Sequence, residues 1–210
     1  IWGADHHGHV ARLQAALDGL GLNGSERLTI VLMQLVNLLQ DGQPVRMSKR
    51  SGKAIALHDL LDEISVDAAR YFFNSRTSTS PLDFDLDLAV REDSENPVYY
   101  VQYAHARICS LISRMAEEGV PVPSAGQVDA ALLQSEEERA LLKALSMLPE
   151  EIRLAARDYD PSRLNRYLVA LAGDFHRFYN AHRIKGEEPA LQAARLKLAD
   201  CVRSVLANGL

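Results

Sequence analysis

Residues 46–52, RMSKRSG, place three cations, a methionine and two hydroxyl side chains next to a glycine. Lys49 carries a compact charge on a flexible stem, which suits contact with a phosphate group that shifts during a reaction. Ser48 and Ser51 add hydroxyl donors, and backbone N–H groups of a loop can bind the same anion. A cation that meets a departing pyrophosphate in the transition state lowers the barrier. The segment predicts a moving loop that binds phosphate; the plainer alternative is a solvated basic turn.

A second candidate site lies at the start of the chain, where Asp5, His6, His7 and His9 crowd together. Asp and His are ligands of divalent metals, but the adjacent His6 and His7 point in opposite directions and rarely face one ion. An Asp just after Gly, at the end of a parallel strand, also lies where doubly wound folds hold a ribose. Gly3 would let a nucleoside approach the backbone closely. Three interpretations stay open: a nucleotide pocket, a metal site, or an Asp5 that only caps the next helix.

The elements around these segments predict the C-terminal remnant of a doubly wound α/β nucleotide-binding domain over residues 1–90. Residues 1–5 form an apolar run that indicates a short strand, and residues 10–20 have helical apolar spacing. The β-branched run 27–39 predicts a strand that turns at Asp41-Gly42 into the basic loop. Two short helices are expected between residues 56 and 76.

Residues 91–210 predict an antiparallel helical bundle, so the chain as a whole should be mainly α. Successive helix starts are marked by a cap or a proline: Asn96-Pro97, Ser135 with Glu138, Asp160-Pro161, and Pro189. The first helix should end at Gly119, the third near residue 185 and the last near residue 209. Pro149 should either kink the second helix or start a new one.

Composition limits the class of protein. The chain has 210 residues, a net charge of -5, two cysteines and no apolar run of the roughly 20 residues that span a bilayer. These features favour a cytoplasmic protein with no disulfide framework. The acidic balance argues against indiscriminate coating of nucleic acid, but it allows a local basic face.

Such a face is predicted on two of the helices. Tyr99, Tyr103 and Arg107 advance by four residues on one side of the first helix, and Tyr179 and Arg183 do so on the third. Aromatic and Arg side chains suit unstacked RNA bases and their phosphates. The alternative is that the tyrosines pack at a domain interface. The opposite, apolar stripe of the first helix should comprise Val98, Val101, His105, Ile108, Ile112 and Met115. The third helix should bury Leu164, Leu168, Leu171 and Phe178. Its other side should expose Phe175 and several basic side chains, for which Asp174 is the only acidic neighbour.

The motifs WGADHHGH, VRMSKRSG, DAAR, LDFDLDLA and NPVYYVQYAHAR, in this order, resemble the arginyl-tRNA synthetase family of class I aminoacyl-tRNA synthetases. RMSKR is similar to the Lys-Met-Ser-Lys-Ser loop of that class, with Arg46 and Arg50 as departures. DAAR, at Asp67–Arg70, resembles the Asp-Ala-Leu-Arg (DALR) element after which the family's anticodon-binding domain is named. The family's His-Ile-Gly-His type motif is absent, so the resemblance implies a fragment that is inactive alone.

The resemblance also implies residue roles. Gly3, Asp5 and His6 would bind the nucleoside of ATP, Met47 and Ser48 would lie against the nucleotide, and Lys49 would contact the triphosphate as the catalytic residue. The residues implied for tRNA are Tyr99, Tyr103, Arg107, Tyr179 and Arg183. ATP, with Mg²⁺ bound to it, is a substrate, and no metal is held by protein side chains.

The implied function is arginine–tRNA ligase activity, with ATP, arginine and an arginine-accepting tRNA as partners, no membrane, and a monomeric state. Two alternatives differ in class. A free-standing RNA-binding helical module would use residues 1–80 only as support. A DHH-type metal phosphoesterase would use Asp5 and its histidines as manganese ligands and would leave RMSKRSG unexplained.

A substitution in the complete enzyme tests the loop. Lys49→Ala should lower the rate of pyrophosphate exchange by about 100-fold, because one preorganised contact to the developing charge is lost. Binding of tRNA should change little. An unchanged exchange rate would remove the role given to Lys49.

Overall fold

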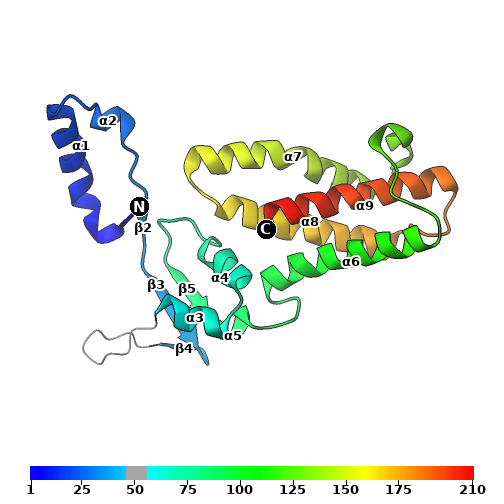
Figure 1. The fold of residues 1–210 in the computed structure, drawn as a ribbon, viewed down its shortest axis with the longest axis horizontal. Helices are drawn as coiled ribbons and strands as arrows, with labels where there is room; N and C mark the ends of the chain where they lie inside the picture. The colour runs from blue at the N-terminus through cyan, green and yellow to red at the C-terminus, as the bar shows by residue number, and fades with distance from the viewer. Residues whose placement is uncertain (46–55) are drawn as a thin grey trace. The chain divides into compact units, whose positions relative to one another are not determined.

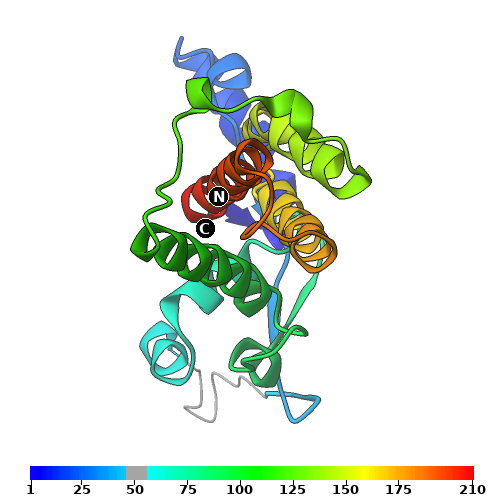
Figure 2. The same cartoon turned by 90° about the vertical axis from the view of Figure 1, so that its right-hand side faces the viewer.

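A computed structural model describes residues 1–45 and 56–210. These residues are mainly α-helical, which confirms the predicted fold class. They form two compact units (Figures 1 and 2). The N-terminal unit comprises Ile1–Val90 and Tyr159–Ser162, and the helical unit comprises Arg91–Asp158 and Arg163–Leu210. Throughout the described part of the chain, every helix is too short or too polar to span a bilayer.

The N-terminal unit begins with a parallel strand pair. β1 (Trp2–Gly3) pairs with β2 (Leu32–Met33), and between them lie the 3-10 helix η1 (Ala4–His9) and the α-helices α1 (Val10–Gly19) and α2 (Gly24–Arg27). The prediction of one strand over residues 27–39 was wrong. Gln34 donates its N–H to the Ser78 carbonyl at 2.8 Å, which interrupts the run, and β3 (Val36–Gln40) continues in a different sheet.

The second sheet has the order β4-β3-β5. β4 (Gln43–Pro44) is antiparallel to β3, and β5 (Leu82–Asp85) is parallel to it. Asp41 and Gly42 both have positive φ, at 51° and 68°, as a tight hairpin turn requires, so the predicted turn is confirmed. The two short helices are also confirmed as α3 (Leu57–Glu63) and α4 (Val66–Phe73), and α5 (Leu86–Ala89) follows β5.

Four long helices form the bundle: α6 (Pro97–Glu117), α7 (Glu136–Asp158), α8 (Ser162–Ala181) and α9 (Pro189–Gly209). The colour gradient in Figure 1 shows that successive helices run in opposite directions, as predicted. The Asn96 side chain accepts the Val98 N–H at 3.1 Å, which confirms the predicted cap of α6. Short 3-10 turns, η2 (Ala125–Gln127) and η3 (Ala130–Leu132), lie in the connection before α7.

Two details of the helices correct the sequence analysis. Pro149 lies inside a continuous α7, so it does not start a new helix. α8 ends at Ala181 instead of near residue 185. The Arg183 carbonyl accepts a hydrogen bond from the Arg195 guanidinium at 2.7 Å, and this contact satisfies the backbone outside the helix.

The core of the helical unit lies between α6, α8 and α9. On α6 the predicted stripe was partly wrong, because Ala104 and Leu111 are buried while His105 and Ile112 are only half-buried. On α8, Leu164 is half-buried and Phe175 is completely buried, so Phe175 belongs to the core and not to an exposed face. The error on α6 is a shift of one residue in helical phase, whereas the error on α8 is the omission of Phe175, which continues the spacing of the buried Leu168, Leu171 and Phe178.

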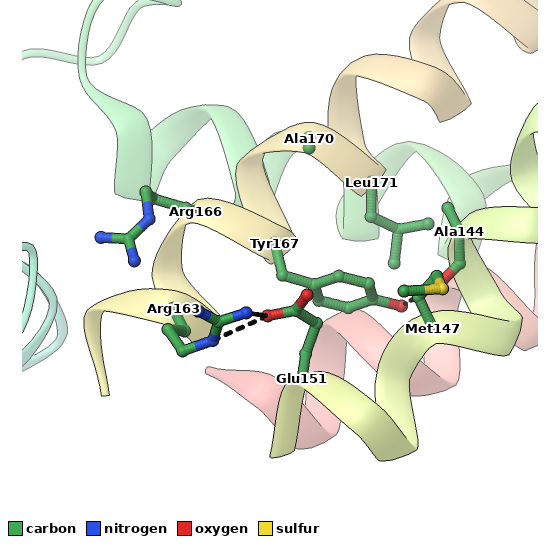
Figure 3. Close-up of a pocket in the computed structure, with 8 residues that line it drawn as sticks. All are labelled: Ala144, Met147, Glu151, Arg163, Arg166, Tyr167, Ala170 and Leu171. Atoms are coloured by element: carbon green, nitrogen blue, oxygen red, sulfur yellow. Dashed lines mark hydrogen bonds and ion pairs between the residues drawn. The ribbon is translucent and has the colours of Figure 1, made fainter. Parts of the chain in front are cut away.

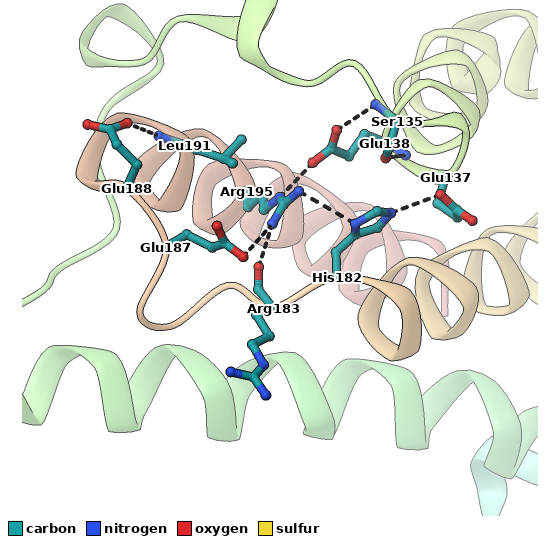
Figure 4. Close-up of polar contacts among 9 residues, drawn as sticks. All are labelled: Ser135, Glu137, Glu138, His182, Arg183, Glu187, Glu188, Leu191 and Arg195. Carbon is teal, nitrogen blue, oxygen red and sulfur yellow. Dashed lines mark hydrogen bonds and ion pairs between the residues drawn. The ribbon is translucent and has the colours of Figure 1, made fainter.

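A buried arginine joins α9 to the start of α7 and to the connection between α8 and α9 (Figure 4). Arg195 of α9 is 8% exposed, and its Nε donates to Glu138 Oε1 at 2.6 Å. Glu138, 1% exposed, also accepts the Ser135 N–H at 2.9 Å while the Ser135 hydroxyl accepts the Glu138 N–H, which confirms the predicted capping box. The Arg195 Nη2 atom lies 3.5 Å from His182 Nδ1, and His182 Nε2 lies 2.8 Å from Glu137 Oε2. We call Arg195, Glu138, His182, Glu137 and the Arg183 carbonyl the Arg195 cluster.

Glu138→Gln tests this cluster. Gln keeps the size of the side chain but removes the buried carboxylate that pairs with the guanidinium at 2.6 Å, and Glu187, at 3.4 Å, is left as its charged partner. The free energy of unfolding should therefore fall by about 3 kcal/mol. Urea unfolding of the 210-residue chain measures it. The matched control is Glu150→Gln, which breaks an exposed pair with Arg153 and should have no measurable effect. Equal effects of the two variants would contradict the prediction.

The same variant should alter the pH dependence of stability. Burial alone would raise the pKa of Glu138, but hydrogen bonds from Ser135 and Arg195 outweigh it and lower the pKa below its usual value. A lowered folded-state pKa gives stabilisation that is present above the unfolded pKa of about 4.3 and is lost as the pH falls through the folded value. The stability difference between wild type and Glu138→Gln should therefore shrink below about pH 4.3.

Candidate functional site

The predicted nucleoside residues lie together at the end of β1. Gly3 ends the strand, and Asp5 and His6 follow in η1, with Asp5 Oδ1 3.0 Å from His6 Nδ1. A Cβ atom on Gly3 would come within 2.5 Å of Asp5 Oδ1, so the absence of a side chain leaves room for this carboxylate. Asp5 does not cap α1, because it lies inside η1, the N-cap residue of α1 is His9, and no side chain caps that helix. That alternative is therefore wrong.

The other predicted ATP residues, Met47, Ser48 and Lys49, lie outside the described residues, as do Arg46 and Arg50. Within residues 1–45 and 56–210, no group of three or more His, Cys, Asp or Glu side chains is arranged to hold a metal ion. Asp5, His6, His7 and His9 thus do not form a metal site among themselves.

Four of the five predicted RNA-binding residues form one cluster in the helical unit. The rings of Tyr99 and Tyr103 stack on successive turns of α6, with centroids 6.3 Å apart and planes at 8°. The Arg107 guanidinium carbon lies 5.9 Å from the Tyr103 ring centroid and 4.2 Å from that of Tyr179 on α8. Such distances permit cation–π attraction. The fifth residue, Arg183, lies in the connection after α8, and its side chain is exposed.

His176, which was not predicted from the sequence, joins this cluster from α8. Its ring centroid lies 5.8 Å from that of Tyr103 and 4.9 Å from that of Tyr100. The apolar spacing of Leu168, Leu171 and Phe178 already carried the signal, because a helix that buries these positions also buries Phe175 and turns residue 176 to the side. We call Tyr99, Tyr103, Arg107, His176 and Tyr179 the aromatic face.

A pocket of about 360 Å³ lies at the aromatic face. Three tyrosine rings and the His176 ring supply its apolar walls, and Arg107 supplies a charge. Its lining consists of Ser94, Tyr99, Tyr100, Tyr103, Arg107, His176 and Asn180.

Most other cations of the helical unit are paired with acids. The expectation that the cations of the predicted third helix face only Asp174 was wrong, because Arg163 of α8 binds Glu151 at 3.0 Å and Lys185, after α8, binds Glu118 at 2.5 Å. Within the described residues, Arg107 makes no ion pair, so its charge stays available at the aromatic face.

A second pocket, of about 370 Å³, lies between α7 and α8 (Figure 3). Several of its polar groups already have partners within it: Arg163 pairs with Glu151, and the Tyr167 hydroxyl donates to the Ala144 carbonyl at 3.0 Å. Burial, with a smaller effect of Glu151, raises the pKa of Tyr167 to about 12, so the hydroxyl keeps its proton. These internal bonds make the aromatic face the stronger candidate for ligand binding.

One family model, described as the DALR anticodon binding domain, matches residues 101–210. The chain belongs to the DALR anticodon-binding family. The match covers most of the helical unit, from Val101 of α6 to the end of α9, and includes Tyr103, Arg107, His176 and Tyr179. Asp67–Arg70, which gave the family resemblance in the sequence, lies outside the matched residues.

Relatives of this DALR protein are named arginine–tRNA ligases. Those of Ruminiclostridium cellulolyticum and Carboxydothermus hydrogenoformans are each 54% identical, over 208 and 210 residues. The alignments cover 99% and 100% of this chain but only 37% and 38% of the ligases. The chain thus spans less than two fifths of the length of these relatives and resembles their C-terminal part.

Solved structures agree with this similarity. A Campylobacter jejuni protein provisionally described as an arginyl-tRNA synthetase matches with a TM-score of 0.85 and 36% identity, over 99% of this chain and 44% of that one. The Thermus thermophilus arginyl-tRNA synthetase matches with a TM-score of 0.77 at 21% identity, over 100% of this chain and 38% of that one. The second match shows a shared fold alone.

Proposed function

We propose that the chain forms part of an arginine–tRNA ligase, in which the helical unit binds the anticodon region of an arginine-accepting tRNA. The observation that carries this proposal is the aromatic face, where stacked tyrosines adjoin Arg107, which has no ion pair in the described part of the chain. Its support is the DALR family match together with similarity to arginine–tRNA ligases over the whole chain.

The chemistry of the aromatic face suits single-stranded RNA. Tyr103 is 49% exposed, so a base can stack on the ring that it presents to solvent. Stacking of one base on an aromatic ring contributes about 1–3 kcal/mol. Arg107 adds a positive charge for a neighbouring phosphate, and its position over Tyr179 holds the guanidinium in place. Unstacked bases of this kind occur in the loops of RNA hairpins.

The N-terminal unit would supply part of the ATP site. Asp5, beside Gly3 at the end of a parallel strand, would accept hydrogen bonds from the ribose hydroxyls. His6 would line the same pocket, and Met47, Ser48 and Lys49 would contact the nucleotide from the basic loop. Mg²⁺ would arrive bound to ATP as part of the substrate.

The proposed reaction has two steps. A carboxylate oxygen of arginine attacks the α-phosphorus of ATP, and the bond to pyrophosphate breaks, which gives arginyl-adenylate. A ribose hydroxyl of the tRNA then attacks the arginyl carbonyl, and AMP leaves. Lys49 would neutralise the charge that grows on pyrophosphate during the first step. A monomer in the cytoplasm is the state we propose for the ligase.

Substitutions on the aromatic face test the proposal. Tyr103→Ala and Arg107→Ala should each weaken binding of an arginine-accepting tRNA by about 10-fold or more, as expected for loss of a stacking or charged contact. Binding is measured by filter retention or anisotropy with the 210-residue chain.

The two variants should differ in their response to salt. Arg107→Ala should reduce the slope of log K against log salt by about 0.7, because one phosphate contact is lost, whereas Tyr103→Ala should not change it. Arg153→Ala on α7, whose charge is already paired with Glu150, is the matched control and should bind normally. Wild-type affinity in both face variants would refute the RNA-binding role.

A further inference from the structure

His176 has a hydrogen-bonding atom that nothing in the described chain satisfies. Its Nε2 is buried and has no hydrogen-bond partner among the described residues; no other buried side-chain nitrogen or oxygen there is in this state. A buried polar atom without a partner lowers stability, by about 1–3 kcal/mol in typical cases. Such an atom therefore calls for an explanation.

The surroundings of His176 favour the neutral ring. Burial, and then the nearby Arg107 charge, lower the pKa of His176 below its usual value, against a smaller opposite effect of the Tyr100 backbone. A neutral imidazole has one N–H donor and one acceptor nitrogen. It can therefore make a directed hydrogen bond to an uncharged partner without adding a second cation beside Arg107.

The same ring lines the pocket of the aromatic face. Tyrosine rings offer stacking surfaces there, and Asn180 on the next turn of α8 offers an amide donor and acceptor. Flat apolar walls combined with a few uncharged hydrogen-bonding groups suit a nucleobase better than a phosphate, which would need more than one cation.

We propose that this pocket receives one unstacked base of the bound RNA, and that His176 Nε2 hydrogen-bonds to the edge of that base and so contributes to base selection. This inference rests on the proposed function and adds a specificity-determining residue to it. Tyr103, which is half exposed and stacks over His176 at 5.8 Å, turns aside to admit the base and then stacks on it.

The experiment uses a hairpin RNA that carries the seven-nucleotide anticodon loop of an arginine-accepting tRNA. Each loop position is replaced in turn by an abasic residue to find the position that contacts the pocket, and the four bases are then compared at that position. Affinities are measured for the wild-type chain, His176→Phe and His176→Gln. Phe keeps a flat ring without nitrogen, and Gln keeps a donor and an acceptor near the Nε2 position.

Wild type should prefer one base at that position by about 3- to 10-fold, the effect of one neutral hydrogen bond. His176→Phe should abolish the preference, His176→Gln should keep part of it, and all three proteins should bind the abasic RNA equally. His176→Phe should also melt no earlier than wild type, because it removes an unsatisfied buried atom. The control His105→Phe, a half-buried histidine of α6 that does not line the pocket, should keep the preference.

Two results would overturn the inference: an unchanged base preference in His176→Phe, or an equal loss of affinity for all four bases and the abasic RNA. Failure of the inference is separable from failure of the proposed function. If Tyr103→Ala and Arg107→Ala weaken RNA binding while His176→Phe keeps the base preference, only the inference fails. If those two variants also bind normally, the RNA-binding function itself fails.

Discussion

The helical unit depends on one buried guanidinium. Arg195 brings a charge into the protein interior, and the cost of removing it from water is offset only because several acceptors surround it. Glu138 supplies the counter-charge from the start of α7, while the Arg183 carbonyl and the Glu187 carboxylate, 3.4 Å away, come from the connection between α8 and α9. Glu138 is distant from Arg195 in sequence, so the contact can form only when α7, α9 and the connection between α8 and α9 are correctly aligned. It also fixes where α8 ends, because the Arg183 carbonyl is used outside the helix.

The aromatic face follows from that alignment and from the core. Ile108 of α6 and Phe175 and Phe178 of α8 are completely buried, which sets the rotation of both helices. With those side chains inward, Tyr103 and Arg107 on one helix and His176 and Tyr179 on the other meet at the outer edge of the same seam. The rings stack on one another and on Arg107 before any ligand arrives. A preformed surface of this kind loses little conformational freedom on binding, which favours affinity.

Local signals made much of the fold predictable, and long-range contacts account for what was missed. The Asn96 cap, the Ser135–Glu138 capping box and the Asp41–Gly42 turn act over a few residues, and each appeared as expected. The interruption after β2 depends on a hydrogen bond from Gln34 to Ser78, and the end of α8 depends on Arg195; neither partner could be identified from spacing.

The aromatic face was largely found through Tyr99, Tyr103 and Arg107, because a four-residue period is a local property. His176 was missed because Phe175, the residue before it, was assigned to the exposed face of α8, whereas Phe175 is buried. The RMSKRSG segment and its Lys49 stay a prediction.

Charge explains how an acidic chain can carry an RNA-binding face. Arg153, Arg163 and Lys185 are each paired with a glutamate, so they add little positive field beyond their own surroundings. Arg107 is different, because its guanidinium lies over aromatic rings that attract it without neutralising it. Such a surface offers an approaching RNA few unpaired cations and a large area of aromatic rings for stacking. Double-stranded RNA keeps its bases inside the helix and could use only the charge, whereas a loop with unstacked bases could use both. The combination of many paired cations with an arginine at the aromatic face that makes no ion pair among the described residues therefore favours looped RNA over RNA duplexes, and it limits the part of the affinity that salt can remove.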